Sequence, residues 1–218
     1  KVQEINELIR RDISEDAYAV MEQDPHPYTG RNLAEDLETA LYLCPVCVQT
    51  GTLSSKGNTL YCTCGFRTEY DQYGAFHGTV PEGRRPAADP FATVRDWWLW
   101  QEAAMEGIAL SAGDGPVCSD EDQELYEIRS ASRAELAARG RLTLGTGGLC
   151  CGPVRFSLRD IGELAITGQR TITFAAGKKQ YELKSRFPRS AAKYKRVFEV
   201  LTKKIPSAET SAGAQRED

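Results

Sequence analysis

Four cysteines stand in a short stretch of the chain as two close pairs. The first pair lies in the segment CPVC and the second in the segment CTCG; the four are Cys44, Cys47, Cys62 and Cys64. Each pair fits on one tight turn, and a hairpin between the turns brings the pairs face to face, as a tetrahedral four-sulfur site requires. The spacing therefore predicts a zinc ribbon over residues 44–80, in which the four thiolates bind one structural Zn²⁺.

The composition of residues 44–80 favours a bound metal. The stretch contains few large apolar side chains. A unit of fewer than roughly 40 residues seldom folds without a disulfide, a bound metal or oligomerisation. Structural zinc contributes on the order of 10–16 kcal/mol of apparent binding free energy at neutral pH. The pattern departs from many zinc knuckles at two points, because Val48 stands where a glycine is common and Thr63 alone separates the second pair.

The alternative is a set of four free or disulfide-bonded thiols. Disulfides need an oxidising compartment, whereas the opening residues KVQEINELIRRDI are charged and contain no apolar signal region. We therefore expect a cytoplasmic chain. Its mean hydropathy of -0.44 and its short apolar runs predict no transmembrane helix. Because the chain opens with lysine rather than methionine, we also expect it to be a piece of a longer protein.

The segments on either side of the cysteines have different patterns, and together they predict an α+β chain. Residues 1–43 form a helical lead-in, with one helix around Ile5 and a second after the capping pair Asn32 and Glu35. Residues 81–113 form a linker with a helix that begins near Thr93. This helix carries three indoles, of which at least one is expected at an interface between domains or at lipid headgroups; they are Trp97, Trp98 and Trp100.

The remainder of the chain is rich in short β-type runs. Residues 114–205 contain six such runs separated by Gly-containing turns, which predict an antiparallel sheet. Ser190 then caps a helix with one apolar stripe, made of Tyr194, Val197, Phe198 and Leu201. Strands closed by one C-terminal helix suggest a pleckstrin-homology-like (PH-like) β-domain. Residues 206–218 are small and polar and are expected to be a disordered tail.

Charge is distributed unevenly along the chain. The net charge is -4, yet residues 1–43 carry 4 basic and 10 acidic side chains, and residues 140–205 carry 14 basic and 4 acidic ones, a local charge of +10. Eight basic residues of the last hairpin and helix are expected to converge on one rim: Lys178, Lys179, Lys184, Arg186, Arg189, Lys193, Lys195 and Arg196. Such a rim would attract an anionic membrane surface. The ribbon itself has no cationic surface, so we expect no nucleic-acid partner.

The other residues capable of chemistry have plainer interpretations. Cys150 and Cys151 are neighbours in a predicted strand and point to opposite faces, while Cys118 is expected in a loop. We interpret one or two of these three thiols as small buried hydrophobes. Both histidines, His26 and His77, are interpreted as surface or packing residues, so no catalytic residue is expected in this chain.

The order of motifs resembles one family. INELIRRDISEDAYA, NLAEDLETALYLCPVC, YGAFHGT, TVRDWW, FSLRDI and KYKRVFEVL follow one another between residue 4 and about residue 203. This succession is similar to the region that follows the catalytic domain in certain bacterial 1-acyl-glycerol-3-phosphate acyltransferases of the lysophosphatidate type. The resemblance implies an accessory region of a phospholipid-biosynthesis enzyme, joined to an N-terminal catalytic domain and peripheral at the inner face of the cell membrane.

The resemblance does not extend to catalysis. The family uses a His and an Asp separated by four residues to activate the glycerol hydroxyl, and His26 and His77 are followed at that distance by Arg31 and Glu82. Any enzyme activity would therefore belong to the parent protein. The other class of function that remains is a zinc-ribbon adaptor that binds protein or nucleic acid, and the basic residues of the β-domain are also compatible with a solvated face that binds nothing.

Overall fold

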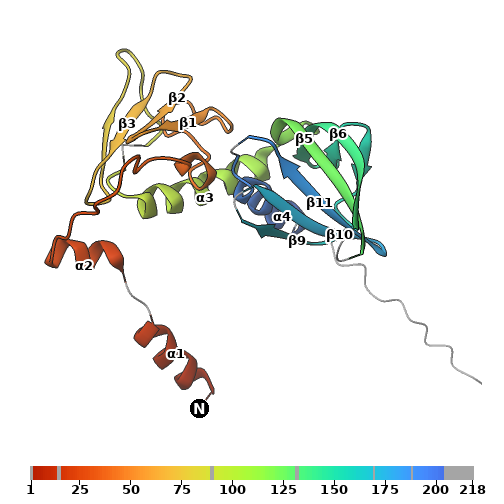
Figure 1. Cartoon of the computed structure of the whole chain (residues 1–218), viewed down its shortest axis with the longest axis horizontal. Coiled ribbons are helices and arrows are strands. Elements are labelled where there is room, and N and C mark those ends of the chain that lie inside the picture. Colours follow the sequence, from red (N-terminus) through yellow and green to blue (C-terminus); the bar gives the residue numbers. More distant parts are fainter. Residues whose placement is uncertain are drawn as a thin grey trace, which may run out of the picture. The chain divides into compact units, whose positions relative to one another are not determined.

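The computed structural model describes residues 2–13, 16–88, 91–130, 133–168, 170–187 and 189–203. The chain divides into two compact units, Lys1–Leu99 and Trp100–Asp218. Each unit contains helices and one antiparallel sheet, so the predicted mixed α+β class is confirmed (Figure 1). The expected tail at 206–218 lies outside the described residues.

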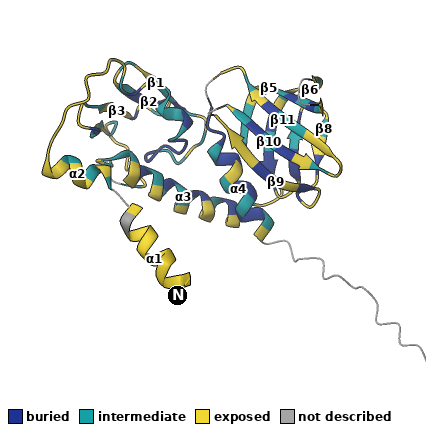
Figure 2. Cartoon of the chain, turned by 60° about the horizontal axis from the view of Figure 1, so that its bottom comes forward, coloured by how far each residue is buried: buried dark blue, intermediate teal, exposed yellow. Residues whose placement is uncertain are grey.

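Among the described residues, three helical segments precede the cysteines in the first unit. They are α1 (Val2–Ile13), α2 (Ala17–Gln23) and the short 3-10 helix η1 (Leu37–Thr39). Asp16 caps α2, because its carboxylate accepts a hydrogen bond from the Tyr18 N–H at 3.1 Å. The apolar side chains of α1 are exposed, and Figure 2 shows this helix in the colour of exposed residues over most of its length.

The prediction of a helix after Asn32 is wrong, since only the short 3-10 helix η1 forms there. Asn32 and Asp36 both have positive φ angles, 58° and 62°, which interrupt a right-handed helix. Contacts far along the chain explain these angles: the Leu33 N–H donates to the Asn58 side chain at 2.8 Å, and the Ala34 N–H donates to the Gly57 carbonyl at 3.0 Å. These hydrogen bonds replace the helical ones that the capping pair would have started.

The sheet of the first unit has four antiparallel strands in the order β1-β2-β3-β4. The strands are β1 (Leu53–Lys56), β2 (Thr59–Cys62), β3 (Arg67–Tyr70) and β4 (Phe76–Thr79). Lys56 pairs with Thr59, so Gly57 and Asn58 form a two-residue hairpin turn. The two strands expected around this turn are confirmed, and the hairpin holds Cys62 at its end.

The helix α3 (Val94–Ser111) begins where the sequence predicted. The Thr93 hydroxyl accepts the Asp96 N–H at 3.1 Å and donates to the Asp96 carboxylate at 2.7 Å, which is a side-chain cap of the first turn. Trp97 is 1% exposed and lies in the core of the first unit. Trp98 is half-buried and contacts the Tyr42 ring edge to face.

The second unit is built on one sheet of seven antiparallel strands in the order β8-β7-β6-β5-β11-β10-β9. The strands are β5 (Pro116–Ser130), β6 (Arg133–Gly145), β7 (Gly148–Cys151), β8 (Val154–Phe156), β9 (Ile161–Thr167), β10 (Thr171–Ala176) and β11 (Lys179–Ser185). The antiparallel sheet predicted from the β-type runs is confirmed. Cys118, however, lies in β5 and is buried, so its predicted loop position is wrong.

The C-terminal helix α4 (Ala192–Lys203) covers part of this sheet and contacts β5, β6 and β9. The four residues of its predicted apolar stripe are all buried. Ser190 is not the cap, because the Ala191 carbonyl accepts the Tyr194 and Lys195 N–H groups and the buried Ser190 hydroxyl has no partner among the described residues. Over the part of the chain that the structure describes, no helix is both long and apolar enough to cross a membrane.

Candidate metal centre

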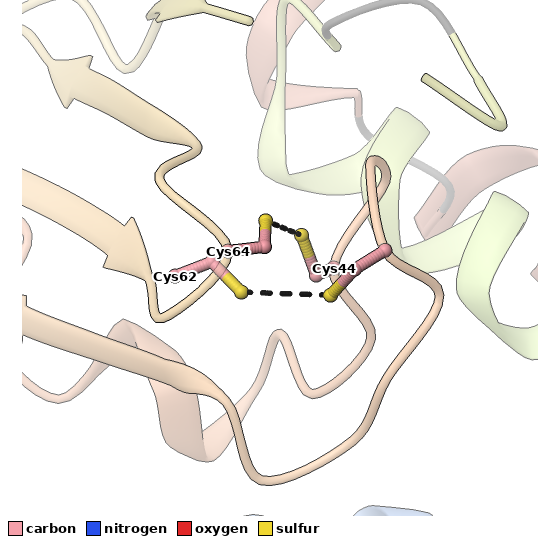
Figure 3. A group of neighbouring side chains, drawn as sticks. Cys44, Cys62 and Cys64 are labelled. Carbon is pink, nitrogen blue, oxygen red and sulfur yellow. Dashed lines mark hydrogen bonds between the residues drawn. The ribbon is translucent and has the colours of Figure 1, made fainter. Parts of the chain in front are cut away.

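The four cysteine sulfurs of the first unit lie together. The Sγ atoms of Cys44 and Cys64 are 3.8 Å apart, those of Cys47 and Cys62 are 3.7 Å apart, and all four lie within 4.8 Å of one another (Figure 3). Zn–S bonds of about 2.3 Å in a tetrahedron place the sulfurs about 3.8 Å apart. The four residues singled out by spacing thus have the separation that a metal ion needs.

The first pair lies on a tight turn closed by the backbone. The Val48 N–H donates to the Cys44 carbonyl at 3.0 Å, and the Val46 N–H approaches the Cys44 sulfur at 3.4 Å. Val48 has a φ of 54°, in the left-handed region that favours glycine. Many zinc knuckles have a glycine at this position, and the valine here adopts the left-handed conformation at a cost in backbone strain.

The second pair lies where β2 ends and the chain turns toward β3. The Gly65 N–H donates to the Cys62 carbonyl at 3.0 Å, and the Cys62 N–H donates to the Phe66 carbonyl at 2.9 Å. Gly65 has a φ of 96°, which only glycine adopts readily. This turn orients Cys62 and Cys64 toward the first pair although Thr63 alone separates them.

Burial and mutual contact shift the acidity of the thiols. Cys44 and Cys62 are buried, and Cys47 and Cys64 are half-buried. The contact with the Cys62 sulfur, followed by burial, raises the pKa of Cys44. The contact with Cys44 in turn lowers the pKa of Cys62 to about 4. The cluster thus contains a thiol that ionises readily, and thiolates are the form in which cysteine binds metals.

Trp97 supports the cluster from α3. Its indole Nε1–H donates to the carbonyl of Leu43, the residue before Cys44, at 2.9 Å. Its ring contacts Phe66, two residues beyond Cys64, with centroids 5.8 Å apart. One buried side chain therefore contacts residues next to both cysteine pairs, and no local sequence signal connected it with them.

The two histidines lie outside the cluster. His77 is exposed in β4, and its Nε2 lies 2.7 Å from the Asp71 carboxylate. His26 is exposed, and its Nδ1 lies 2.9 Å from the Asp24 carbonyl. Neither is among the residues brought together at the four sulfurs.

The remaining cysteines belong to the second unit. Cys118 and Cys151 are buried, as expected for small hydrophobes, and Cys150 is half-buried. Cys150 and Cys151 are consecutive in β7, and their different burial fits the predicted opposite orientations.

The eight basic residues expected on one rim do not form it. Arg189 and Lys193 are 5% and 1% exposed and face the interior. Lys179 is the first residue of β11 and Arg186 follows its last residue, and the seven residues of this strand span about 20 Å. Acidic partners lie beside four of the eight: Glu127 beside Lys179, Glu182 beside Lys184, Glu199 beside Lys195, and Glu102 and Glu106 beside Arg196. The predicted rim is therefore wrong, because sequence does not reveal which basic side chains are turned inward or neutralised.

Comparisons of the chain with protein-family profiles, with curated proteins and with solved structures found no match.

Proposed function

We propose that residues 44–80 of the first unit form a zinc ribbon in which Cys44, Cys47, Cys62 and Cys64 bind one structural Zn²⁺. The observation that carries the proposal is the mutual approach of the four sulfurs within 4.8 Å. Four protein thiolates fill a tetrahedral zinc shell and leave no position for water or substrate, which is typical of structural rather than catalytic sites. The ion would cross-link the turn before β1 to the turn after β2.

The role that we propose for the whole chain is that of a non-catalytic accessory region of a phospholipid-biosynthesis acyltransferase. The order of motifs from residue 4 to about residue 203 supports this assignment. In the second unit, seven antiparallel strands followed by one helix are the order expected of a PH-like domain. In this proposal the catalytic His and Asp belong to an N-terminal domain of the parent protein.

Membrane contact in this proposal depends on fewer residues than the charge count suggested. Arg186 is exposed at the end of β11, and the adjacent Phe187 is 58% exposed, with its ring 5.9 Å from the Arg186 guanidinium carbon. A cation beside an exposed aromatic ring suits an anionic lipid interface. Sedimentation with phosphatidylglycerol and with neutral vesicles tests this contact, and equal binding to both would contradict it.

Metal analysis tests the zinc proposal directly. Protein purified under reducing conditions should contain about one zinc per chain, and Cys44→Ser should lose it, because three sulfurs do not complete the shell. Cys150→Ser is the matched control, since Cys150 is half-buried in the second unit and is not one of the four clustered cysteines. Much less than one zinc in the unmodified chain, or equal zinc in both variants, would overturn the proposal.

A further inference from the structure

A cluster of buried charged groups lies in the second unit under the start of α4. Lys193 and Arg189 are both buried there. The Lys193 Nζ lies 2.8 Å from one carboxylate oxygen of Asp120, and the Tyr194 hydroxyl donates to the other at 2.7 Å. Asp120 thus pairs with Lys193, and among the described residues the two buried cations exceed this one carboxylate by one positive charge.

Arg189 has no carboxylate partner among the residues that the structure describes. Its Nη2 donates to the Arg170 and Leu183 carbonyls at 3.2 and 3.4 Å. Its Nε and Nη1 are buried and have no hydrogen-bond partner in the described part of the chain. The guanidinium carbon lies 5.4 Å from the Tyr194 ring, which offers a cation–π contact but no acceptor for these N–H groups.

The described neighbouring side chains do not supply the missing negative charge. Burial raises the pKa of the Cys118 thiol to about 12, and burial likewise raises the pKa of Cys151, so both remain neutral thiols. Gln123 is neutral and donates to the Ser185 hydroxyl at 3.0 Å. The buried Ser190 hydroxyl, unpartnered within the described residues, remains able to donate one further hydrogen bond.

The backbone strengthens the positive field at the same place. Arg189 and Ser190 stand three and two residues before the first residue of α4, and Lys193 and Tyr194 belong to its first turn. The N-terminus of this 12-residue helix carries a partial positive charge and presents free N–H groups. A buried cation without a partner is costly, and here the helix end adds to the excess rather than offsetting it.

We propose that the second unit binds one small monovalent anion, of the size of chloride, beside the Arg189 guanidinium at the N-terminus of α4. The Nε–H and Nη1–H groups of Arg189 and the Ser190 hydroxyl supply the donors. One negative charge balances the excess positive charge left by Lys193, Arg189 and Asp120, whereas a dianion would make the net charge of the cluster negative. The anion thereby stabilises the packing of α4 on the sheet.

Calorimetry of the full, metal-loaded chain tests the proposal in sodium chloride against sodium fluoride at matched ionic strength. The unfolding midpoint of the second unit should rise with chloride concentration, by roughly 5–15 °C at a chloride concentration of 100 times the Kd. The binding that causes this rise should be saturable. Arg189→Met should abolish the saturable rise, and Arg186→Met, which removes an exposed arginine three residues earlier, should retain it.

Each alternative result overturns the assignment. An equal response of the unmodified chain and Arg189→Met would mean a general salt effect, and no response would mean that the cluster is hydrated and binds no anion. A rise with phosphate but not with chloride would replace the halide by a phosphate group. If Arg189→Met does not fold, ³⁵Cl line broadening by the unmodified chain, reversed by bromide, decides the question, and absence of broadening contradicts the proposal.

Discussion

Replacing Trp97 by phenylalanine should weaken the first unit and its hold on a metal. Trp97 contacts the carbonyl before Cys44 through its indole N–H, and its ring lies among three aromatic neighbours. The ring centroids are 5.8 Å from Phe66, 5.5 Å from Phe76 and 5.8 Å from Phe91. The phenyl ring is smaller and has no donor, so the substitution removes a hydrogen bond and leaves a void.

The size of the effect follows from these two losses. A buried carbonyl that loses its donor costs about 1–3 kcal/mol. The missing part of the indole removes a few buried atoms, each CH₂-sized group contributing about 0.8 kcal/mol. We therefore expect Trp97→Phe to lower the free energy of unfolding of the first unit by about 2–5 kcal/mol and, if the proposed zinc is bound, to speed its release to a chelator.

Trp98→Phe is the matched control, because Trp98 is the next residue of α3 and is only half-buried. It should cost less than about 1 kcal/mol, the usual range for partly exposed sites without such contacts. Urea unfolding followed by circular dichroism measures both variants. Equal destabilisation by the two substitutions, or a cost below about 1 kcal/mol for Trp97→Phe, would refute the role given to the indole.

Two further substitutions test the charged contacts. Asp120→Asn should lower the free energy of unfolding of the second unit by about 3–5 kcal/mol, measured by urea unfolding in chloride-free buffer, because it leaves buried Lys193 without its carboxylate. The control Glu182→Gln removes the partner of exposed Lys184 and should cost less than about 1 kcal/mol. Equal losses for the two substitutions would contradict the importance of the buried pair. Burial raises the pKa of Asp71, but hydrogen bonds from His77 and from the Ala75 and Tyr73 N–H groups outweigh it and hold this pKa below its usual 3.8. His77→Ala should therefore raise the pKa of Asp71 in a carboxyl NMR titration, whereas His26→Ala should leave it unchanged. Since the folded pKa lies below the unfolded one, the lost stability should be seen above about pH 4 and vanish as the pH falls through the folded pKa; no change at Asp71 would show that His77 is only a neighbour.

The features that sequence predicted well are those set by near neighbours. Two cysteine pairs with short internal spacing, a Gly57–Asn58 turn and an apolar stripe on α4 each follow from a few consecutive residues. The failures came from distant contacts. The capping pair Asn32 and Glu35 indicated a helix, but the chain there bonds to the turn between β1 and β2 instead.

The basic residues failed for the same reason. Lysine is usually exposed on the surface, yet Lys193 is buried, and its partner Asp120 stands 73 residues earlier in the chain. Burial of a lysine depends on such a partner, which no local window contains. Likewise, Cys118 precedes the polar run SDEDQ, which lacks the alternation of a half-buried strand although it belongs to β5.

The left-handed conformation of Val48 would affect how long the turn from Cys44 to Val48 keeps the ion that we propose it binds. A β-branched residue at a φ of 54° stores about 1–3 kcal/mol of backbone strain. The strain persists only while the surrounding contacts hold the turn closed, so it is released when the turn opens. Every 1.4 kcal/mol released on opening weakens binding about tenfold. A centre built on this valine would therefore exchange its ion with the surroundings more readily than one built on glycine.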